Sequence, residues 1–282
     1  MPELPPVVAA DDPIVSAGRL ADVRWYLDGS DGHAAYLAGH IPGAVWVDLD
    51  TVLAGPPTEA GGRHPLPSPE AFAESLGALG FDDRTPVIAY DDAGGGYAAR
   101  LVWLLRRIGA PAALLDGGLA AWPGALATGE ETLAPAVRTA VPWPRSALRD
   151  ADEVAEAVRT GSAVVLDARA ADRYSGAAVL PSDARSGHIP GARNAPWAAN
   201  LDEDGRFHAP DVLRSRFDAA GIAADTDVIV YCGSGVTACH DLLALERAGL
   251  TSTALYPGSW SAWSADLSRA VTTSTDSTQG EP

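Results

Sequence analysis

The hexapeptide Gly-His-Ile-Pro-Gly-Ala occupies residues 39–44 and returns unchanged at residues 187–192. Three further matches follow the same order in both halves of the chain: Asp22-Val23-Arg24 with Asp167-Ala168-Arg169, Val87 to Tyr90 with Val228 to Tyr231, and Gly118 to Trp122 with Ser259 to Trp263. Similar motifs that recur in the same order along a chain are typical of a repeated structural unit. The sequence therefore predicts a tandem duplication, with one copy of the same fold in each half.

Each half alternates short apolar runs with longer helical patterns. The runs at 164–166 and 228–231 are rich in β-branched residues and end at polar or glycine positions, which suits strands buried on both faces. Helices are expected over 100–108 and 238–248, each followed by a glycine that can end it. Alternating strands and helices predict an α/β fold, with a parallel sheet flanked by helices in each half.

Proline content and the extent of the repeat suggest the domain boundaries. A first domain is expected over 1–130, a proline-bearing linker over 131–149 and a second domain over 150–270. The stretch 271–282, rich in Ser and Thr, is interpreted as a disordered tail. A chain of 282 residues, 47% of them hydrophobic, is long enough to bury two such cores.

Charge and composition exclude several classes of partner. A net charge of −17 repels nucleic acid and anionic membranes, so neither is expected as a partner. All 20 basic residues are arginine, which excludes chemistry that needs a lysine, such as a Schiff base. No stretch approaches the ~18 apolar residues of a membrane span, and the first residues lack a secretory pattern. A cytoplasmic protein is therefore expected.

The strongest chemical signal is the loop that joins the second buried run to its helix, Tyr231-Cys232-Gly233-Ser234-Gly235-Val236-Thr237. Backbone N–H groups of such a loop, with a helix N-terminus behind them, form an anion cradle that stabilises a thiolate or persulfide. The first half carries Asp91 where the second carries Cys232. One copy therefore holds a nucleophile, and the other is expected to be catalytically inert.

The remaining candidate ligands and thiols have simpler interpretations. Cys239 aligns with Ala98 and is expected to be a packed helical cysteine. The other histidines, His33, His64, His208 and His240, form no metal-ligand spacing, so packing or surface roles are expected and no metal site is predicted.

Taken together, these motifs resemble the tandem rhodanese family, and within it most closely the 3-mercaptopyruvate sulfurtransferases. The resemblance covers about residues 15–263 and rests on His-Ile-Pro-Gly in both halves, a strand-ending Cys in the second half only, Asp in its place in the first, and the Trp-terminated segments. It implies two rhodanese-like α/β domains with the site lined partly by the first, no metal or organic cofactor, a small-molecule sulfur donor, and a thiol acceptor such as thioredoxin or a small thiol.

The resemblance also implies roles for particular residues. Cys232 would carry the persulfide, and residues 233–237 would cradle it. A Ser-His-Asp relay maps to Ser234, His40 and Asp31, although His188 occupies the position of His40 in the other repeat. The donor carboxylate would be bound by Arg173 and by Arg185, the latter in a segment, 175–187, that departs from the family's usual form.

Loop charge bears on the choice of donor. Thiosulfate is a dianion and calls for cationic side chains near the sulfur, whereas Gly233 and Ser234 are neutral, which favours mercaptopyruvate. Thiosulfate sulfurtransferase is the nearer alternative, and a non-catalytic sulfur carrier is a further one. Cysteine phosphatases need Arg at the sixth position after the Cys, where this chain has Ala238.

Overall fold

The computed structural model describes residues 4–273, which fold into two compact units. The first unit comprises the residues up to 55 together with 66–144 and 201–208, and the second comprises 56–65, 145–200 and the residues from 209 onward. Each unit thus includes a short segment from the other half of the sequence. Nothing in the repeat pattern indicated these exchanges, and one of them, 56–65, matters for the site.

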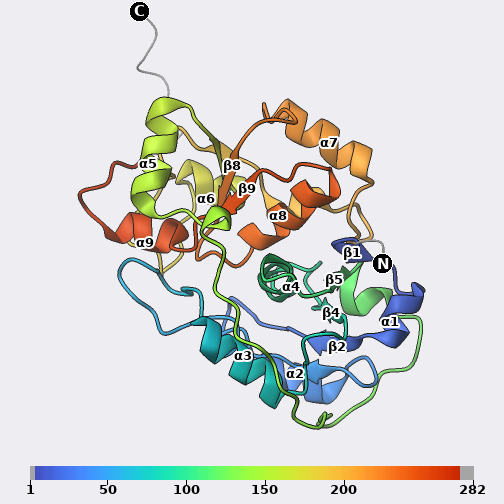
Figure 1. Cartoon of the computed structure of the whole chain (residues 1–282). Coiled ribbons are helices and arrows are strands. Elements are labelled where there is room, and N and C mark those ends of the chain that lie inside the picture. The colour runs from blue at the N-terminus through green and yellow to red at the C-terminus, as the bar shows by residue number, and fades with distance from the viewer. Residues whose placement is uncertain (1–3, 274–282) are drawn as a thin grey trace, which may run out of the picture. The chain divides into compact units, whose positions relative to one another are not determined.

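The first unit contains a parallel five-stranded sheet with strand order β1-β5-β4-β2-β3. Its elements, most of which are labelled in Figure 1, are β1 (Val7–Val8), α1 (Pro13–Ala17), β2 (Arg19–Asp22), α2 (Gly32–Ala38), β3 (Val45–Trp46), α3 (Pro69–Ala78), β4 (Val87–Tyr90), α4 (Ala98–Arg107), β5 (Ala112–Leu115) and the 3-10 turn η1 (Gly118–Ala121). Strands β2, β4 and β5 carry mostly buried side chains, as expected for strands covered on both faces.

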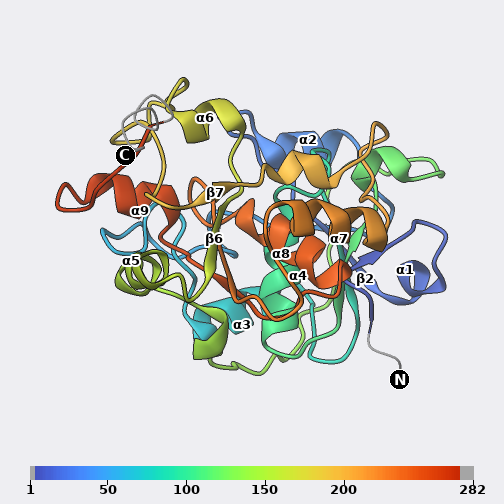
Figure 2. The same ribbon diagram turned by 90° about the horizontal axis from the view of Figure 1, so that it is seen from above.

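The second unit repeats the plan with a parallel four-stranded sheet of order β7-β6-β8-β9. Its elements are η2 (Arg145–Ala147), α5 (Ala151–Thr160), β6 (Val164–Asp167), α6 (Ala171–Ser175), β7 (Arg193–Asn194), η3 (Trp197–Asn200), α7 (Pro210–Ala219), β8 (Val228–Tyr231), α8 (Ala238–Arg247), β9 (Thr253–Leu255) and α9 (Ser259–Ala265). Figures 1 and 2 show α5 and α9 on one face of this sheet and α7 and α8 on the other.

Local chemistry explains why the second unit folds in this way. Helix α5 begins at a capping box in which Asp150 and Glu153 each accept the other's backbone N–H, and it ends at Gly161 with a left-handed φ of 69°. A core of buried residues from β6, β8, α5 and α9, which includes Trp260 and Trp263, fixes the helices against the sheet. The carboxyl ends of β6 and β8 therefore lie at a defined edge, where parallel α/β sheets place their sites.

The predicted fold class is confirmed, and the predicted elements agree closely with the structure. The helix expected over 100–108 is α4, which begins two residues earlier, and the helix expected over 238–248 is α8. Both end before glycines, 109 and 249, whose φ angles are 78° and 77°. Of the tail predicted over 271–282, the part from 274 onward lies outside the described residues, while Thr272 forms an isolated bridge with His188. No helix in residues 4–273 has the length and apolar character that a membrane span requires.

Candidate active site

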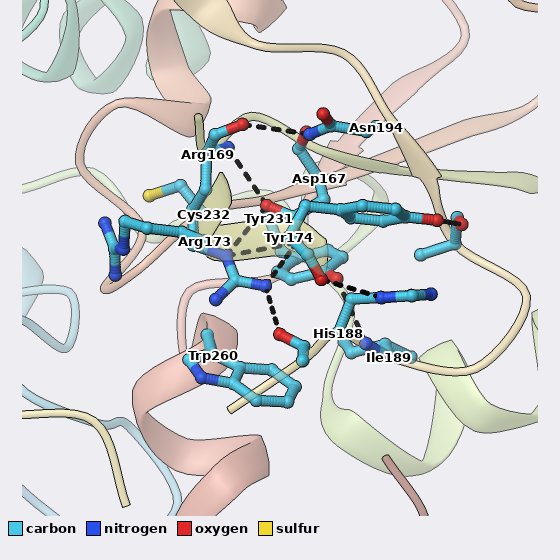
Figure 3. Close-up of polar contacts among 12 residues, drawn as sticks. Asp167, Arg169, Arg173, Tyr174, His188, Ile189, Asn194, Tyr231, Cys232 and Trp260 are labelled. Atoms are coloured by element: carbon cyan, nitrogen blue, oxygen red, sulfur yellow. Dashed lines mark hydrogen bonds and ion pairs between the residues drawn. The ribbon is translucent and has the colours of Figure 1, made fainter. Parts of the chain in front are cut away.

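The repeated hexapeptide is part of a polar frame beneath the site. In the second unit Arg169 forms a buried ion pair with Asp167 at 2.6 Å and donates to the Gly187 carbonyl at 2.8 Å. The Ile189 N–H donates to the Tyr231 hydroxyl, and His188 Nδ1 bonds the Tyr174 carbonyl at 2.9 Å. Figure 3 shows these contacts beside Cys232. The partners lie at strand ends, in a turn and on α6, so the frame connects these segments to the edge of the sheet from which the loop starts.

The first unit contains the same frame, and this accounts for His40. Arg24 pairs with Asp22 at 2.7 Å and donates to the Gly39 carbonyl, while His40 Nδ1 bonds the Tyr36 carbonyl at 2.9 Å. His40 is fully buried and stacks on the Tyr36 ring. It therefore holds a turn as His188 does, which differs from the relay role expected for it.

Asp31, the expected third member of the relay, has a local role as well. It is the N-cap of α2, where its side chain accepts the Ala34 N–H at 3.0 Å. A short carboxylate placed before a helix satisfies an N–H that has no partner within the helix. The structure thus places Asp31 as a helix cap.

Cys232 follows β8 directly and lies inside a buried loop. Its side chain is 2% exposed, and its Sγ accepts the Gly235 N–H at 3.1 Å. Gly235 has a φ of 79°, a left-handed value that permits the curl and that glycine adopts without strain. Of the predicted cradle, the Gly235 N–H therefore contacts the sulfur.

The start of α9 holds this loop from the other side. The Cys232 N–H donates to Ser259 Oγ at 3.1 Å, and the N–H groups of Trp260 and Ser261 donate to the carbonyls of Cys232 and Gly233 at 3.0 and 2.9 Å. Within the described residues Ser259 is the one non-glycine residue with a positive φ, 50°. A side chain in this conformation is strained, and such strain is concentrated at functional sites.

The equivalent loop of the first unit encloses an acidic side chain. Its Asp91 carboxylate is fully buried and accepts four backbone N–H groups, those of Ala93, Gly95, Tyr97 and Ala98, at 2.7 to 2.9 Å. Burial raises the pKa of Asp91, while the four N–H groups act in the opposite direction by favouring the ionised form. The repeated loop therefore directs several backbone N–H donors at the acceptor group that it encloses.

A histidine does reach Ser234, but it is His64. His64 Nδ1 lies 2.8 Å from Oγ of Ser234, the residue two positions after Cys232 in the sequence. His64 was expected to have a packing or surface role, because it forms no metal-ligand spacing with the other histidines. The repeat pattern gives no sign that 56–65 belongs to the second unit. The hairpin Thr58 to Gly62, whose ends exchange hydrogen bonds of 2.8 and 3.2 Å, positions His64.

Two arginines flank the loop at Gly233. A Cβ at this position would lie 3.1 Å from Nη2 of Arg173 and 3.4 Å from Nη2 of Arg63. Figure 3 shows the Arg173 side chain on the side of the frame where the Cys232 sulfur lies. Arg173 was predicted at the site and Arg63 was not. The neutral loop is therefore accompanied by two guanidinium groups that come from other segments.

Arg185, predicted as the second arginine at the site, is used elsewhere. Its guanidinium donates to four backbone carbonyls at 2.7 to 3.0 Å, those of Trp263, Ser264, Asp266 and Arg269. These carbonyls lie at the end of α9 and just after it, where the last turn of a helix leaves acceptors without partners. Arg185 therefore caps that end, which differs from the substrate-binding role expected for it.

Cys239 lies on a helix, as the sequence predicts for a packed cysteine. Cys239 is fully buried on α8, and its thiol lies 3.5 Å from the Gly235 carbonyl. No group of three or more potential metal ligands occurs in the part of the chain that the structure describes.

Comparison with known proteins agrees with the repeated fold. The model of the rhodanese-like domain matches twice, at residues 9–125 and 150–266. The chain therefore belongs to the rhodanese-like family, as a tandem of two such domains. Within that family it is a sulfurtransferase, and sulfurtransferases need a sulfur donor and a thiol acceptor.

The named relatives fall into two groups. A probable 3-mercaptopyruvate sulfurtransferase of Pseudomonas aeruginosa is 44% identical over 260 residues, which cover 89% of this chain and 91% of the relative. A putative thiosulfate sulfurtransferase of Mycobacterium tuberculosis is 40% identical over 273 residues, covering 95% and 94%. A crystal structure of an Escherichia coli 3-mercaptopyruvate sulfurtransferase is 32% identical, with a TM-score of 0.76 over 91% of this chain and 99% of that one.

Proposed function

We propose that this sulfurtransferase takes sulfur from 3-mercaptopyruvate through a persulfide on Cys232. The Cys232 thiolate attacks the donor thiol sulfur, the carbon–sulfur bond breaks, and its electron pair leaves with the carbon as the enolate of pyruvate. Protonation of that enolate gives pyruvate, and the outer sulfur stays on Cys232 until an acceptor thiol removes it. Thioredoxin and small thiols have suitable chemistry as acceptors.

The observation that carries the proposal is the cradle around the Cys232 sulfur. The Gly235 N–H donates to Sγ at 3.1 Å, and the same loop of the first unit surrounds the carboxylate of Asp91 with four N–H groups. A persulfide is an anion that extends further into such a loop than the thiolate does. Preorganised N–H donors stabilise it without reorganisation during the reaction.

In this proposal His64 and Ser234 supply the protons. The departing pyruvate develops negative charge on its ketone oxygen, and the Ser234 hydroxyl, two residues from the nucleophile, can donate a hydrogen bond to it. His64 Nδ1, at 2.8 Å from Ser234 Oγ, orients that hydroxyl and exchanges a proton with it. We therefore assign the relay histidine to His64 in place of His40, with no role for Asp31.

The two arginines supply the carboxylate site in this proposal. Arg173 and Arg63 both reach the region of Gly233, and guanidinium groups bind carboxylates through paired N–H donors. The same pair of positive charges favours the alternative donor, thiosulfate, more than a neutral loop alone would. The named relatives include both activities.

A side-by-side kinetic comparison tests the choice of donor. The purified protein is assayed with each donor and the same acceptor thiol, and pyruvate release is followed for mercaptopyruvate. We expect kcat/KM to favour 3-mercaptopyruvate. A preference for thiosulfate would transfer the proposal to the alternative donor, and single-turnover loading without steady-state turnover would indicate a sulfur carrier.

A further inference from the structure

The carboxylate of Asp183 forms ion pairs with both arginines that flank the loop, Arg63 and Arg173. Its Oδ1 lies 2.9 Å from Arg63 Nη1, and its Oδ2 lies 2.9 Å from Arg173 Nη2. The Asp183 side chain is 2% exposed, whereas those of Arg63 and Arg173 are 27% and 18% exposed. One carboxylate thus bridges two guanidinium groups that solvent can still reach.

This arrangement has the chemistry of a bound substrate carboxylate. Each oxygen faces one guanidinium, and both guanidinium groups flank Gly233, the residue that follows the proposed nucleophile. Charge-assisted bonds of this kind are the contacts that a donor carboxylate needs. Arg173 also has a buried Nε with no hydrogen-bond partner in the described residues, so it retains donor capacity beyond its contact with Asp183.

The loop that carries Asp183 is bounded by two glycines in left-handed backbone conformations. Gly176 and Gly187 stand at its ends with φ angles of 87° and 98°. Between them the Asp183 N–H donates to the Leu180 carbonyl at 2.9 Å, so the turn is closed by its own backbone. Rotation of the Asp183 side chain can therefore vacate the arginines without unfolding the turn.

We propose that Asp183 is an internal carboxylate that occupies the donor's anion-binding position between Arg63 and Arg173 and is exchanged for the donor carboxylate. The inference rests on the proposed function, because it concerns the same site. While Asp183 occupies this position, the donor cannot bind there. The apparent affinity for the donor is therefore the intrinsic affinity multiplied by the fraction of molecules in which the position is free. Exchange of one carboxylate for another leaves the local charge unchanged, which suits a monocarboxylate donor better than a dianion.

Pyruvate is a suitable probe, because it has the carboxylate and ketone of the donor but no sulfur to transfer. Its dissociation constant is measured by titration calorimetry on the full chain. Asp183→Asn removes the competing charge and should tighten pyruvate binding about tenfold, equivalent to ~1.4 kcal/mol. Asp183→Glu keeps a carboxylate and should bind pyruvate nearly as weakly as the wild type does.

Two further variants keep the test decisive. Asp218→Asn makes the same change of charge on the exposed face of α7 and should leave pyruvate affinity unchanged. If Asp183→Asn fails to fold, Asp183→Ser replaces it with the same expectation. Weaker pyruvate binding in the neutral variant would show that Asp183 only positions the arginines, and unchanged binding would show that it does not compete; either result overturns the inference.

The readouts separate this inference from the proposed function. Pyruvate binding requires no sulfur transfer, so its response to Asp183→Asn is informative even if Cys232 forms no persulfide. Conversely, the wild type could form the persulfide while pyruvate affinity stays the same across the variants. That result would leave the proposed function intact and reject the role of Asp183. In the neutral variant, kcat/KM for thiosulfate should rise more than that for 3-mercaptopyruvate.

Discussion

At the scale of single residues, the contact between His64 and Ser234 predicts a loss of turnover when either side chain is removed. We expect His64→Ala and Ser234→Ala each to lower kcat by roughly 10²-fold or more, because general acid–base assistance contributes about 10²–10⁴-fold. The double variant should be little worse than either single one, since the two groups act as a unit.

A matched control distinguishes catalysis from folding. His40→Ala removes the corresponding turn contact to the Tyr36 carbonyl and leaves a fully buried cavity, so it should lower the melting temperature. His64→Ala should lower turnover with little change in melting temperature. A His64 variant that retains full kcat would reject the relay and return attention to other proton donors.

Sequence patterns identified some site residues and not others for a physical reason. Cys232 and Arg173 lie within a few residues of recognisable strand ends, so their placement follows from local structure. His64 and Arg63 stand in a segment with no strand or helix pattern, and their role depends on which unit that segment joins. The expected role of Arg185 differs from its place in the structure because sequence position alone does not reveal that four backbone carbonyls accept hydrogen bonds from its guanidinium.

At the scale of elements, the hairpin at 58–62 places His64 through a close backbone approach. A Cβ on Gly62 would overlap Ser261 Oγ and lie 2.7 Å from the Gly258 carbonyl oxygen, both at the start of α9. Gly62→Ala should therefore displace Arg63 and His64 and lower kcat/KM by at least about tenfold, as expected when small misplacements disturb reacting geometry.

Gly205→Ala is the matched control for this substitution. Gly62 and Gly205 share a φ of 71°, but a Cβ at Gly205 meets nothing within 4 Å. The control carries the strain of a left-handed backbone without the overlap, so it should cost some stability and little activity. Equal loss of activity in both variants would show that the close approach at Gly62 is unimportant.

Helix α8 contains a buried acid whose ionisation should destabilise the protein. Burial raises the pKa of Asp241 to about 7, against the opposing effects of Arg216 and Asn200. The unfolded chain ionises this carboxyl near 3.9, so stability should fall as pH rises from about 4 to 7 and stay level above that. The difference corresponds to a cost of about 4 kcal/mol at ~1.4 kcal/mol per pKa unit.

Asp241→Asn tests this cost directly. The variant should gain free energy of unfolding relative to the wild type progressively between about pH 4 and pH 7, as measured by urea denaturation across that range. Asp225→Asn, at an exposed position, makes the same change of charge and is the control. A gain that is equal at pH 4 and pH 8 would contradict the account.

Element types were predictable because the two halves of the sequence repeat the same pattern. The apolar runs of β4 and β8 are bounded in the same way, and helices α4 and α8 both end before a glycine with positive φ. The 3-10 turn η2 lies within the predicted linker. It was not predicted, because three residues give no measurable periodicity.

At the scale of the whole molecule, the second half of the sequence is not sufficient for the proposed site. A fragment that begins at residue 145 keeps Cys232, Ser234 and Arg173 but lacks the segment 56–65 with Arg63 and His64. We expect it to form the persulfide slowly and to lose roughly 10²-fold or more in kcat/KM. Circular dichroism checks that the fragment is folded. A folded fragment with full activity would contradict the assignment of both residues.

The central claim, that Cys232 carries the transferred sulfur, is tested most directly by intact-mass spectrometry. The full chain is incubated with 3-mercaptopyruvate in the absence of an acceptor, and Cys232→Ser and Cys239→Ser are treated in parallel. The account predicts that wild type and Cys239→Ser each gain the mass of one sulfur atom, which an acceptor thiol then removes, while Cys232→Ser gains none. Sulfur loading of the Cys232→Ser variant, or no loading of the wild type by either 3-mercaptopyruvate or thiosulfate, would contradict it.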